Sequence, residues 1–246
     1  VRGILPMAVK AREEGLRRLI VPCDNACEAA VVEGVEVIGA ASLGETVEYL
    51  RGDRTIAPAA ASAAFAEEEG GYAEDFADVK GQAAVKRALE IAAAGGHNVL
   101  MIGAPGSGKT MLARRMTGIL PELSVEDQQE ALCIHSVLGE NIDGLLAGPR
   151  PFRSPHHSIS TAGLIGGGRP VHPGEISLAH GGVLFLDELA EFPTGVLQTL
   201  RQPIERGYVR IVRVDGAFTF PSRFQLLAAS NPCPCGFLGD REVPCR

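Results

Sequence analysis

Residues 103–110 form a glycine-rich run that ends in Lys109 and Thr110. The run follows the apolar residues 99–102 and precedes a helix-like segment at 111–120. Glycine has no Cβ, so the backbone can curl tightly and point its N–H groups at bound phosphates. A lysine adds positive charge at the β- and γ-phosphates, and a threonine hydroxyl is a ligand for Mg²⁺. The G-x-x-x-x-G-K-T spacing therefore predicts that the chain binds a nucleoside triphosphate.

Two acidic residues, Asp187 and Glu188, follow a second apolar run at 183–186. Open α/β sheets bind their ligands at the carboxyl ends of the strands, where such side chains lie. We predict that Asp187 and Thr110 hold Mg²⁺, largely through water, because Mg²⁺ keeps much of its hydration shell. Glu188 is predicted to be catalytic, orienting and polarising the attacking water. The alternative is a strand that ends in a solvated acidic turn.

A third apolar run begins at Phe224 and ends in Asn231, whose amide can hold a water molecule or a γ-phosphate oxygen. The alternative for Asn231 is a turn residue before Pro232. Because it follows the other two motifs in chain order, Asn231 is predicted to act in catalysis with Lys109 and Glu188. The predicted nucleotide-binding residues are Gly103, Ala104, Pro105, Gly106, Ser107, Gly108, Lys109, Thr110 and Met111.

Alternating helix and strand patterns position these motifs and predict an α/β fold with a parallel sheet whose faces are covered. Ser42 is the expected N-cap of one helix, and Gly95 and Gly96 are expected to end another. Residues 54–71 lack periodicity and are predicted to link a small α/β domain at 1–53 to a second domain at 72–246. The predicted helices are 5–18, 43–50, 82–94 and 111–120, and residues 23–31 are predicted to form a loop and then a helix. The predicted strands are 18–21, 35–40, 99–102, 183–186 and 224–231.

Composition narrows the class of protein. The chain has 246 residues, of which 46% are hydrophobic, and its net charge of −7 argues against a uniformly basic nucleic-acid binder. No apolar run approaches the roughly 20 residues of a membrane span, and no secretion signal opens the chain. We therefore expect a cytoplasmic protein without a membrane partner, in which the six cysteines are reduced or metal-bound.

Two long insertions interrupt the predicted core. Seventy-eight positions separate Lys109 from Asp187, and the extra length includes residues 153–177. A second insertion, at 207–221, reads as a β-hairpin with alternating strands around an Asp-Gly turn at 215–216.

The three motifs, in this order, resemble Walker A, Walker B and sensor 1 of AAA+ ATPases. The two insertions resemble the helix-2 insert and the pre-sensor-1 hairpin of the magnesium-chelatase-like clade. Within that clade, four stretches resemble the ComM/YifB family of bacterial ATPases. They are Arg-Ser-Pro-His-His at 153–157, Pro-Gly-Glu-Ile-Ser-Leu-Ala-His at 173–180, Leu-Phe-Leu-Asp-Glu at 184–188 and Ser-Asn-Pro-Cys-Pro-Cys-Gly at 230–236.

This resemblance implies a P-loop NTPase core of the AAA+ type at 72–246. It implies that 1–53 is the C-terminal part of a Lon-protease-like domain, in which no catalytic Ser–Lys pair can be assigned. Family members are hexameric, ATP- and Mg²⁺-dependent DNA motors that promote branch migration in natural transformation, so a homo-hexameric DNA helicase or translocase is expected. The family's lid, arginine finger and sensor 2 arginine lie beyond Arg246, so this chain is expected to bind ATP but hydrolyse it poorly.

Two other functions fit the same motifs. One is a chelatase motor subunit that drives metal insertion into a tetrapyrrole; the Lon-like unit, which that class lacks, counts against it. The other is a nucleotide-gated interaction module, in which binding rather than turnover is the signal.

Cys233, Cys235 and Cys245 have the type and spacing of three ligands of a zinc site, for which four are usual. The alternative is three reduced thiols in a proline-rich loop.

Other residues have less specific signals. The adjacent His156 and His157 suggest a tight turn or a pore contact rather than a metal site. Four arginines frame the predicted hairpin, where they contact a DNA backbone or are solvated strand-edge charges. They are Arg201, Arg206, Arg210 and Arg213.

Overall fold

The computed structural model describes residues 1–61, 74–140, 142–146, 149–214 and 216–235, together with residues 238 and 245. They fall into two units, one comprising residues 1–70 and 132–147 and the other residues 71–131 and 148–246. The first unit is therefore not continuous in sequence, because it contains residues 132–147, which the predicted domain at 1–53 did not include. Among the described residues, no helix is long and apolar enough to span a membrane.

The first unit is a small α/β arrangement built on two parallel strands, β1 and β2. Its elements are α1 (Ile4–Glu13), β1 (Arg18–Pro22), α2 (Cys23–Ala29), β2 (Glu36–Ala40) and α3 (Leu43–Arg51). Ser42 caps α3 as predicted, because its side chain accepts a hydrogen bond from the Glu45 N–H. The predicted helix at 5–18 was too long. Gly15 adopts a φ of +72°, which ends α1 at Glu13.

Residues 132–147 complete the core of the first unit. This segment contains the C-terminal part of α7 (Val125–Leu138) and α8 (Asp143–Leu146). Leu132 and Ile142 are buried in one cluster with Leu5, Val21 and Val37. The apolar faces of β1 and β2 are thus covered partly by residues more than ninety positions away.

The start of the predicted linker also pairs with the first unit. Pro58 forms an antiparallel bridge with Ile38, and the Ala59 N–H donates to the Val37 carbonyl at 2.8 Å. The later part of the predicted linker, from residue 62, lies outside the described residues.

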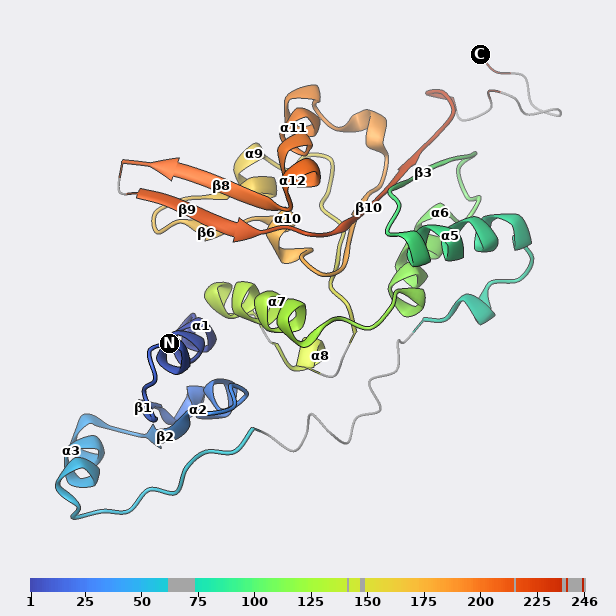
Figure 1. The fold of residues 1–246 in the computed structure, drawn as a ribbon. Coiled ribbons are helices and arrows are strands. Elements are labelled where there is room, and N and C mark those ends of the chain that lie inside the picture. The colour runs from blue at the N-terminus through green and yellow to red at the C-terminus, as the bar shows by residue number, and fades with distance from the viewer. Residues whose placement is uncertain are drawn as a thin grey trace. The chain divides into compact units, whose positions relative to one another are not determined.

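The second unit contains a four-stranded parallel sheet in the order β3–β10–β7–β4. Figure 1 shows β3 beside β10. The strands are β3 (Val99–Ile102), β4 (Phe152–Arg153), β7 (Val183–Leu186) and β10 (Gln225–Ser230). Side chains of β7 alternate between two apolar clusters, with Val183 and Phe185 on one face and Leu184 and Leu186 on the other. The strand is therefore buried on both faces, as the continuous apolar run predicted.

One face of the sheet packs on residues of α5, α6 and η2. The elements before and after the phosphate loop are η1 (Phe76–Asp78), α5 (Ala83–Gly95), α6 (Lys109–Arg115) and η2 (Met116–Ile119). Gly96 follows α5 with a φ of +62°, which confirms the predicted glycine C-cap.

The other face packs on residues of α9, α10, α11 and the hairpin. The prediction of fully covered faces was wrong at the β3 edge, where Leu100 and Ile102 are exposed. The elements on this side are α9 (Thr161–Ile165), β5 (Gly166–Gly167), β6 (His172–Pro173), α10 (Glu175–Leu178), η3 (Leu189–Glu191), α11 (Thr194–Thr199) and α12 (Arg201–Arg206).

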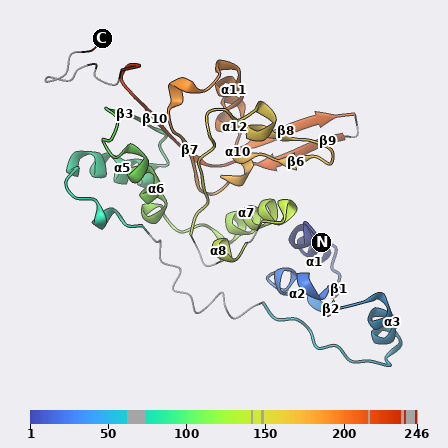
Figure 2. The same ribbon diagram turned by 180° about the vertical axis from the view of Figure 1, so that it is seen from behind.

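The predicted hairpin is present as β8 (Tyr208–Arg213) and β9 (Gly216–Pro221), paired antiparallel along their whole length. Asp215, half of the predicted turn, lies outside the described residues. Figures 1 and 2 show the hairpin projecting on the side of the sheet away from α5 and α6.

Gly182, just before β7, lets the backbone there lie close to that of Pro151, just before β4. A Cβ on Gly182 would lie 1.9 Å from the Pro151 carbonyl oxygen, which itself accepts from the Val183 N–H at 2.8 Å. We expect Gly182→Ala to destabilise this chain by about 3 kcal/mol, because backbone must move to relieve the overlap. Urea unfolding measures the change. Gly195→Ala, in α11 with open space around it, is the control and should not destabilise the protein. Equal stability of Gly182→Ala and the unmodified chain would contradict this account.

Candidate nucleotide-binding site

Three chain-distant motifs meet at one edge of the sheet because their strands are parallel neighbours. The phosphate loop follows β3, Asp187 and Glu188 follow β7, and Asn231 follows β10, which lies between the other two strands. Parallel strands present their carboxyl ends at the same edge, so the order β3–β10–β7 brings the motifs together.

A cavity of about 410 Å³ lies among these motifs. Gly106 and Gly108 line it with φ of +77° and +86°, a conformation that favours glycine. Gly103 and Ala104, which were also predicted to bind nucleotide, are not among its lining residues. The lining residues are Pro105, Gly106, Ser107, Gly108, Lys109, Thr110, Met111, Asp187, Glu188, Ser230 and Asn231.

The Lys109 ammonium group connects the phosphate loop to the end of β10. Its Nζ donates to the carbonyl oxygens of Gly103 and Ala104 at 2.7 and 3.1 Å, and to Asn231 Oδ1 at 3.2 Å. Gly103 and Ala104 therefore hold the lysine through their backbone. These three oxygens hold the ammonium group of Lys109, which lines the cavity and is able to pair with a bound phosphate.

Thr110 and Asp187 meet directly. The Thr110 hydroxyl donates to Asp187 Oδ2 at 2.7 Å, and Asp187 Oδ1 accepts from the Glu188 N–H at 3.0 Å. A hydroxyl and a carboxylate are the hard oxygen donors that Mg²⁺ prefers, so the two residues fit the predicted magnesium site.

Glu188 has an unusual backbone and a neighbour that the sequence analysis missed. Its φ and ψ are 51° and 49°, in the left-handed region that a side chain with a Cβ rarely adopts. Its Oε2 lies 3.5 Å from Nδ1 of His157, in the loop after β4. His157 also packs edge-on against the buried Phe192. The predicted turn is present, because the Ile159 N–H donates to the His156 carbonyl at 2.9 Å, and it places His157 beside the carboxylate predicted to be catalytic.

Gln82 is a second residue that sequence reasoning missed. It precedes α5 with a φ of +56°, and its Nε2 donates to the Ser107 carbonyl at 3.0 Å. Gln82 and Glu188 are the two non-glycine residues with positive φ among the described residues, and both touch this site. Strained backbone of this kind is typical of functional sites.

The insertion at 153–177 is pinned near the sheet by an ion pair between its two ends. The Arg153 guanidinium group forms a bidentate ion pair with the Glu175 carboxylate, with Nε–Oε2 and Nη2–Oε1 distances of 2.7 and 2.9 Å. This bidentate pair is geometrically specific, so it fixes the loop that carries His157 relative to β4.

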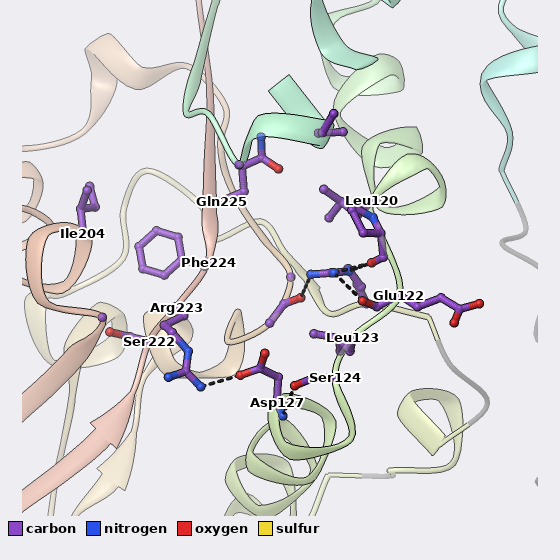
Figure 3. A pocket seen from close by; sticks show the side chains of 18 of the residues that line it. Leu120, Glu122, Leu123, Ser124, Asp127, Ile204, Ser222, Arg223, Phe224 and Gln225 are labelled. Atoms are coloured by element: carbon purple, nitrogen blue, oxygen red, sulfur yellow. Dashed lines mark hydrogen bonds and ion pairs between the residues drawn. The ribbon is translucent and has the colours of Figure 1, made fainter. Parts of the chain in front are cut away.

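A second cavity, of about 520 Å³, lies at the opposite end of β10 (Figure 3). Its rim includes Arg223, which pairs with Asp127 at 2.5 Å and with Glu130 at 2.8 Å. The neighbouring His180 is fully buried, and burial lowers its pKa. His180 Nδ1 accepts from the Arg223 N–H, so Nε2 carries the proton and is not a metal ligand. We therefore assign no nucleotide or metal to this cavity.

The three predicted zinc ligands come together after β10, outside the nucleotide cavity. Their Sγ–Sγ distances are 3.2 Å for Cys233–Cys235, 3.5 Å for Cys235–Cys245 and 3.6 Å for Cys245–Cys233. Hydrogen bonds with the Cys235 and Cys233 thiols raise the pKa of the Cys245 thiol to about 11.

The arginines around the hairpin have different surroundings. Arg201 pairs with Glu205 on α12 at 3.0 Å, whereas Arg210 and Arg213 are exposed on β8. Arg213 and Arg169 line a hollow of about 750 Å³ with exposed apolar residues of the hairpin. The insertion and the hairpin thus share one surface.

The sequence of this chain is similar to those of a known family and of several bacterial proteins. The family "Magnesium chelatase, subunit ChlI" matches residues 75–246. The chain is 44% identical to YifB of Escherichia coli, covering 96% of this chain and 46% of that protein. It is also 44% identical to the competence protein ComM of Haemophilus influenzae, covering 96% and 47%. The chain spans about half the length of these relatives.

A solved structure supports the same fold. The complex between the BchI and BchD subunits of magnesium chelatase superimposes with a TM-score of 0.51 and 24% identity, covering 66% of this chain and 56% of that one. The fold is therefore an AAA+ P-loop core with a parallel sheet. Taken with the strand order and the matched relatives, these findings show that the chain belongs to the magnesium-chelatase-like ComM/YifB family of AAA+ proteins.

Proposed function

We propose that this chain contains the ATP-hydrolysing core of a DNA motor. The observation that carries the proposal is the convergence of Lys109, Thr110, Asp187, Glu188 and Asn231 on one cavity at the carboxyl edge of the sheet. Their oxygen and nitrogen atoms supply phosphate binding, a magnesium site and a carboxylate base within one site.

Each residue has one task in this reaction. Lys109 neutralises phosphate charge, and Thr110 and Asp187 hold Mg²⁺, which when bound neutralises charge developing on the phosphate oxygens. Glu188 orients the attacking water and accepts its proton, and Asn231 contacts the γ-phosphate from the end of β10. Zinc has no part in this reaction, because the three cysteines do not line the nucleotide cavity.

His157 is proposed to position Glu188. An imidazole 3.5 Å from Oε2 restrains where the carboxylate points, and the insertion supplies that imidazole. A ligand that displaces the insertion would therefore change the environment of the catalytic carboxylate.

We further propose that the active assembly is a homo-hexamer. Phosphoryl transfer in related NTPases uses an arginine, and none is present among the residues that line the cavity in the described part of the chain. An arginine from a neighbouring subunit would complete the site. The solved relative is described as a complex of magnesium chelatase subunits, which supports assembly.

DNA is the proposed substrate of the motor, with branch migration during transformation or recombination as its task. ComM of Haemophilus influenzae is named a competence protein, which supports this assignment. The hollow between the insertion and the hairpin presents Arg169 and Arg213, and its described lining residues include no carboxylate. Exposed guanidinium groups of this kind bind phosphate backbones.

We expect single-stranded or branched DNA to stimulate the ATPase of the full-length protein. Replacing Arg169 and Arg213 with alanine should reduce the stimulation and lower the salt dependence of DNA binding by about 1–2 in log–log slope. Steady-state ATPase assays and DNA titrations at several salt concentrations measure both effects. Arg87→Ala, which removes an exposed arginine of α5, is the matched control. Absence of stimulation, together with absence of DNA binding in the presence of ATP, would rule out the motor and favour a nucleotide-gated interaction module.

A further inference from the structure

Three thiols that do not line the nucleotide cavity come together after β10. Cys233, Cys235 and Cys245 lie with all three Sγ–Sγ distances between 3.2 and 3.6 Å. Cys245 is ten positions from Cys235, so the cluster joins two stretches of chain. None of the three is fully buried, which separates them from cysteines that serve as small core residues.

The spacing of the sulfur atoms is close to that of a zinc–thiolate site. In a tetrahedral site with Zn–S bonds of about 2.3 Å, two sulfur atoms lie ~3.8 Å apart. The three sulfurs therefore form one slightly compressed face of such a tetrahedron. A disulfide requires an S–S distance of about 2.05 Å, and three thiols cannot all pair with one another.

We propose that Cys233, Cys235 and Cys245 are three ligands of a structural zinc ion whose fourth ligand lies outside this trio. Three clustered thiolates form a soft donor set, which Zn²⁺ accepts in tetrahedral geometry. This metal is separate from the proposed magnesium site and takes no part in hydrolysis.

A backbone contact supports the ligand role of Cys233. The Leu238 N–H donates to Cys233 Sγ at 3.3 Å, an N–H···S bond of the kind that orients metal-bound thiolates. Cys233 lies two residues after Asn231, and Pro232 and Pro234 restrict the backbone on each side. The bound ion would therefore tether the chain that leaves β10 directly after Asn231.

Metal analysis of the full-length protein, purified without chelator, tests this site. We expect stoichiometric zinc in the unmodified protein and in Cys27→Ser, whose cysteine lies on α2. A Cys233→Ser/Cys235→Ser double variant should lose zinc affinity by at least about tenfold, because two of the ligands are gone. ATP binding by the variant checks that it folds.

Cobalt substitution covers the case in which the double variant does not fold. Zinc removed from the unmodified protein with a chelator is replaced by Co²⁺, and thiolate-to-cobalt charge-transfer absorption is expected. Three results would each overturn the proposal: no stoichiometric zinc in the unmodified protein, zinc fully retained by the folded double variant, or no charge-transfer absorption. Copper or iron in place of zinc would overturn the choice of metal. The Glu188→Gln variant should keep its zinc, so failure of the zinc site and failure of the ATPase are distinguishable.

Discussion

Glu188→Gln is expected to abolish ATP turnover in the full-length protein while leaving ATP binding within about threefold of the unmodified value. The amide keeps the size of the side chain but cannot accept a proton from water, and loss of a general base costs roughly 10²–10⁴-fold in rate. ATP binding survives because Lys109 and the phosphate loop are unchanged. Steady-state kinetics and a fluorescent-nucleotide titration measure the two quantities.

Glu191→Gln is the matched control for this substitution. Glu191 is also an exposed glutamate after β7, three positions further along, and it does not line the nucleotide cavity. Its ATPase rate should match that of the unmodified protein. If Glu188→Gln turned over ATP at the unmodified rate, the assignment of Glu188 as the base would be wrong, and another group would have to activate the water.

Lys109→Ala is expected to weaken ATP binding by about 10–100-fold. A charge-assisted hydrogen bond contributes roughly 1.5–3 kcal/mol, and no other lining residue in the described part of the chain carries a positive charge that could replace the lysine. The variant also releases Asn231 Oδ1 from its bond with Nζ, so turnover should fall further than binding. Calorimetry with a slowly hydrolysed ATP analogue gives the dissociation constant.

The control for Lys109→Ala is Lys80→Ala, which removes an exposed lysine of the same unit that lies outside the cavity. Both variants should unfold at similar temperatures, because an exposed lysine and a lysine held by carbonyl oxygens contribute little to the core. An unchanged dissociation constant for Lys109→Ala would mean that nucleotide binds elsewhere in the protein.

Much of the fold was predictable because it is encoded locally. Continuous apolar runs predicted β7 and β10, glycine pairs predicted the end of α5, and alternation around a turn predicted the hairpin. Each signal is carried by residues adjacent in sequence. Helix α1 shows the limit of such signals, since its periodicity continued past Gly15 but the backbone did not. The exposed Leu100 and Ile102 show a second limit of local signals, since an apolar residue type does not reveal whether another element covers it.

The sequence by itself was enough to predict the candidate site: the phosphate loop, the Mg²⁺ ligands Thr110 and Asp187, the Glu188 carboxylate and the Asn231 amide, in motifs that each follow a predicted strand. It did so because these residue types and spacings are local and specific. Only the tertiary structure decided that His157 lies at Glu188, that Gln82 holds the Ser107 carbonyl, and that residues 132–147 complete the first unit. Those contacts join residues far apart in the chain, and no local pattern specifies which distant surfaces will pack together.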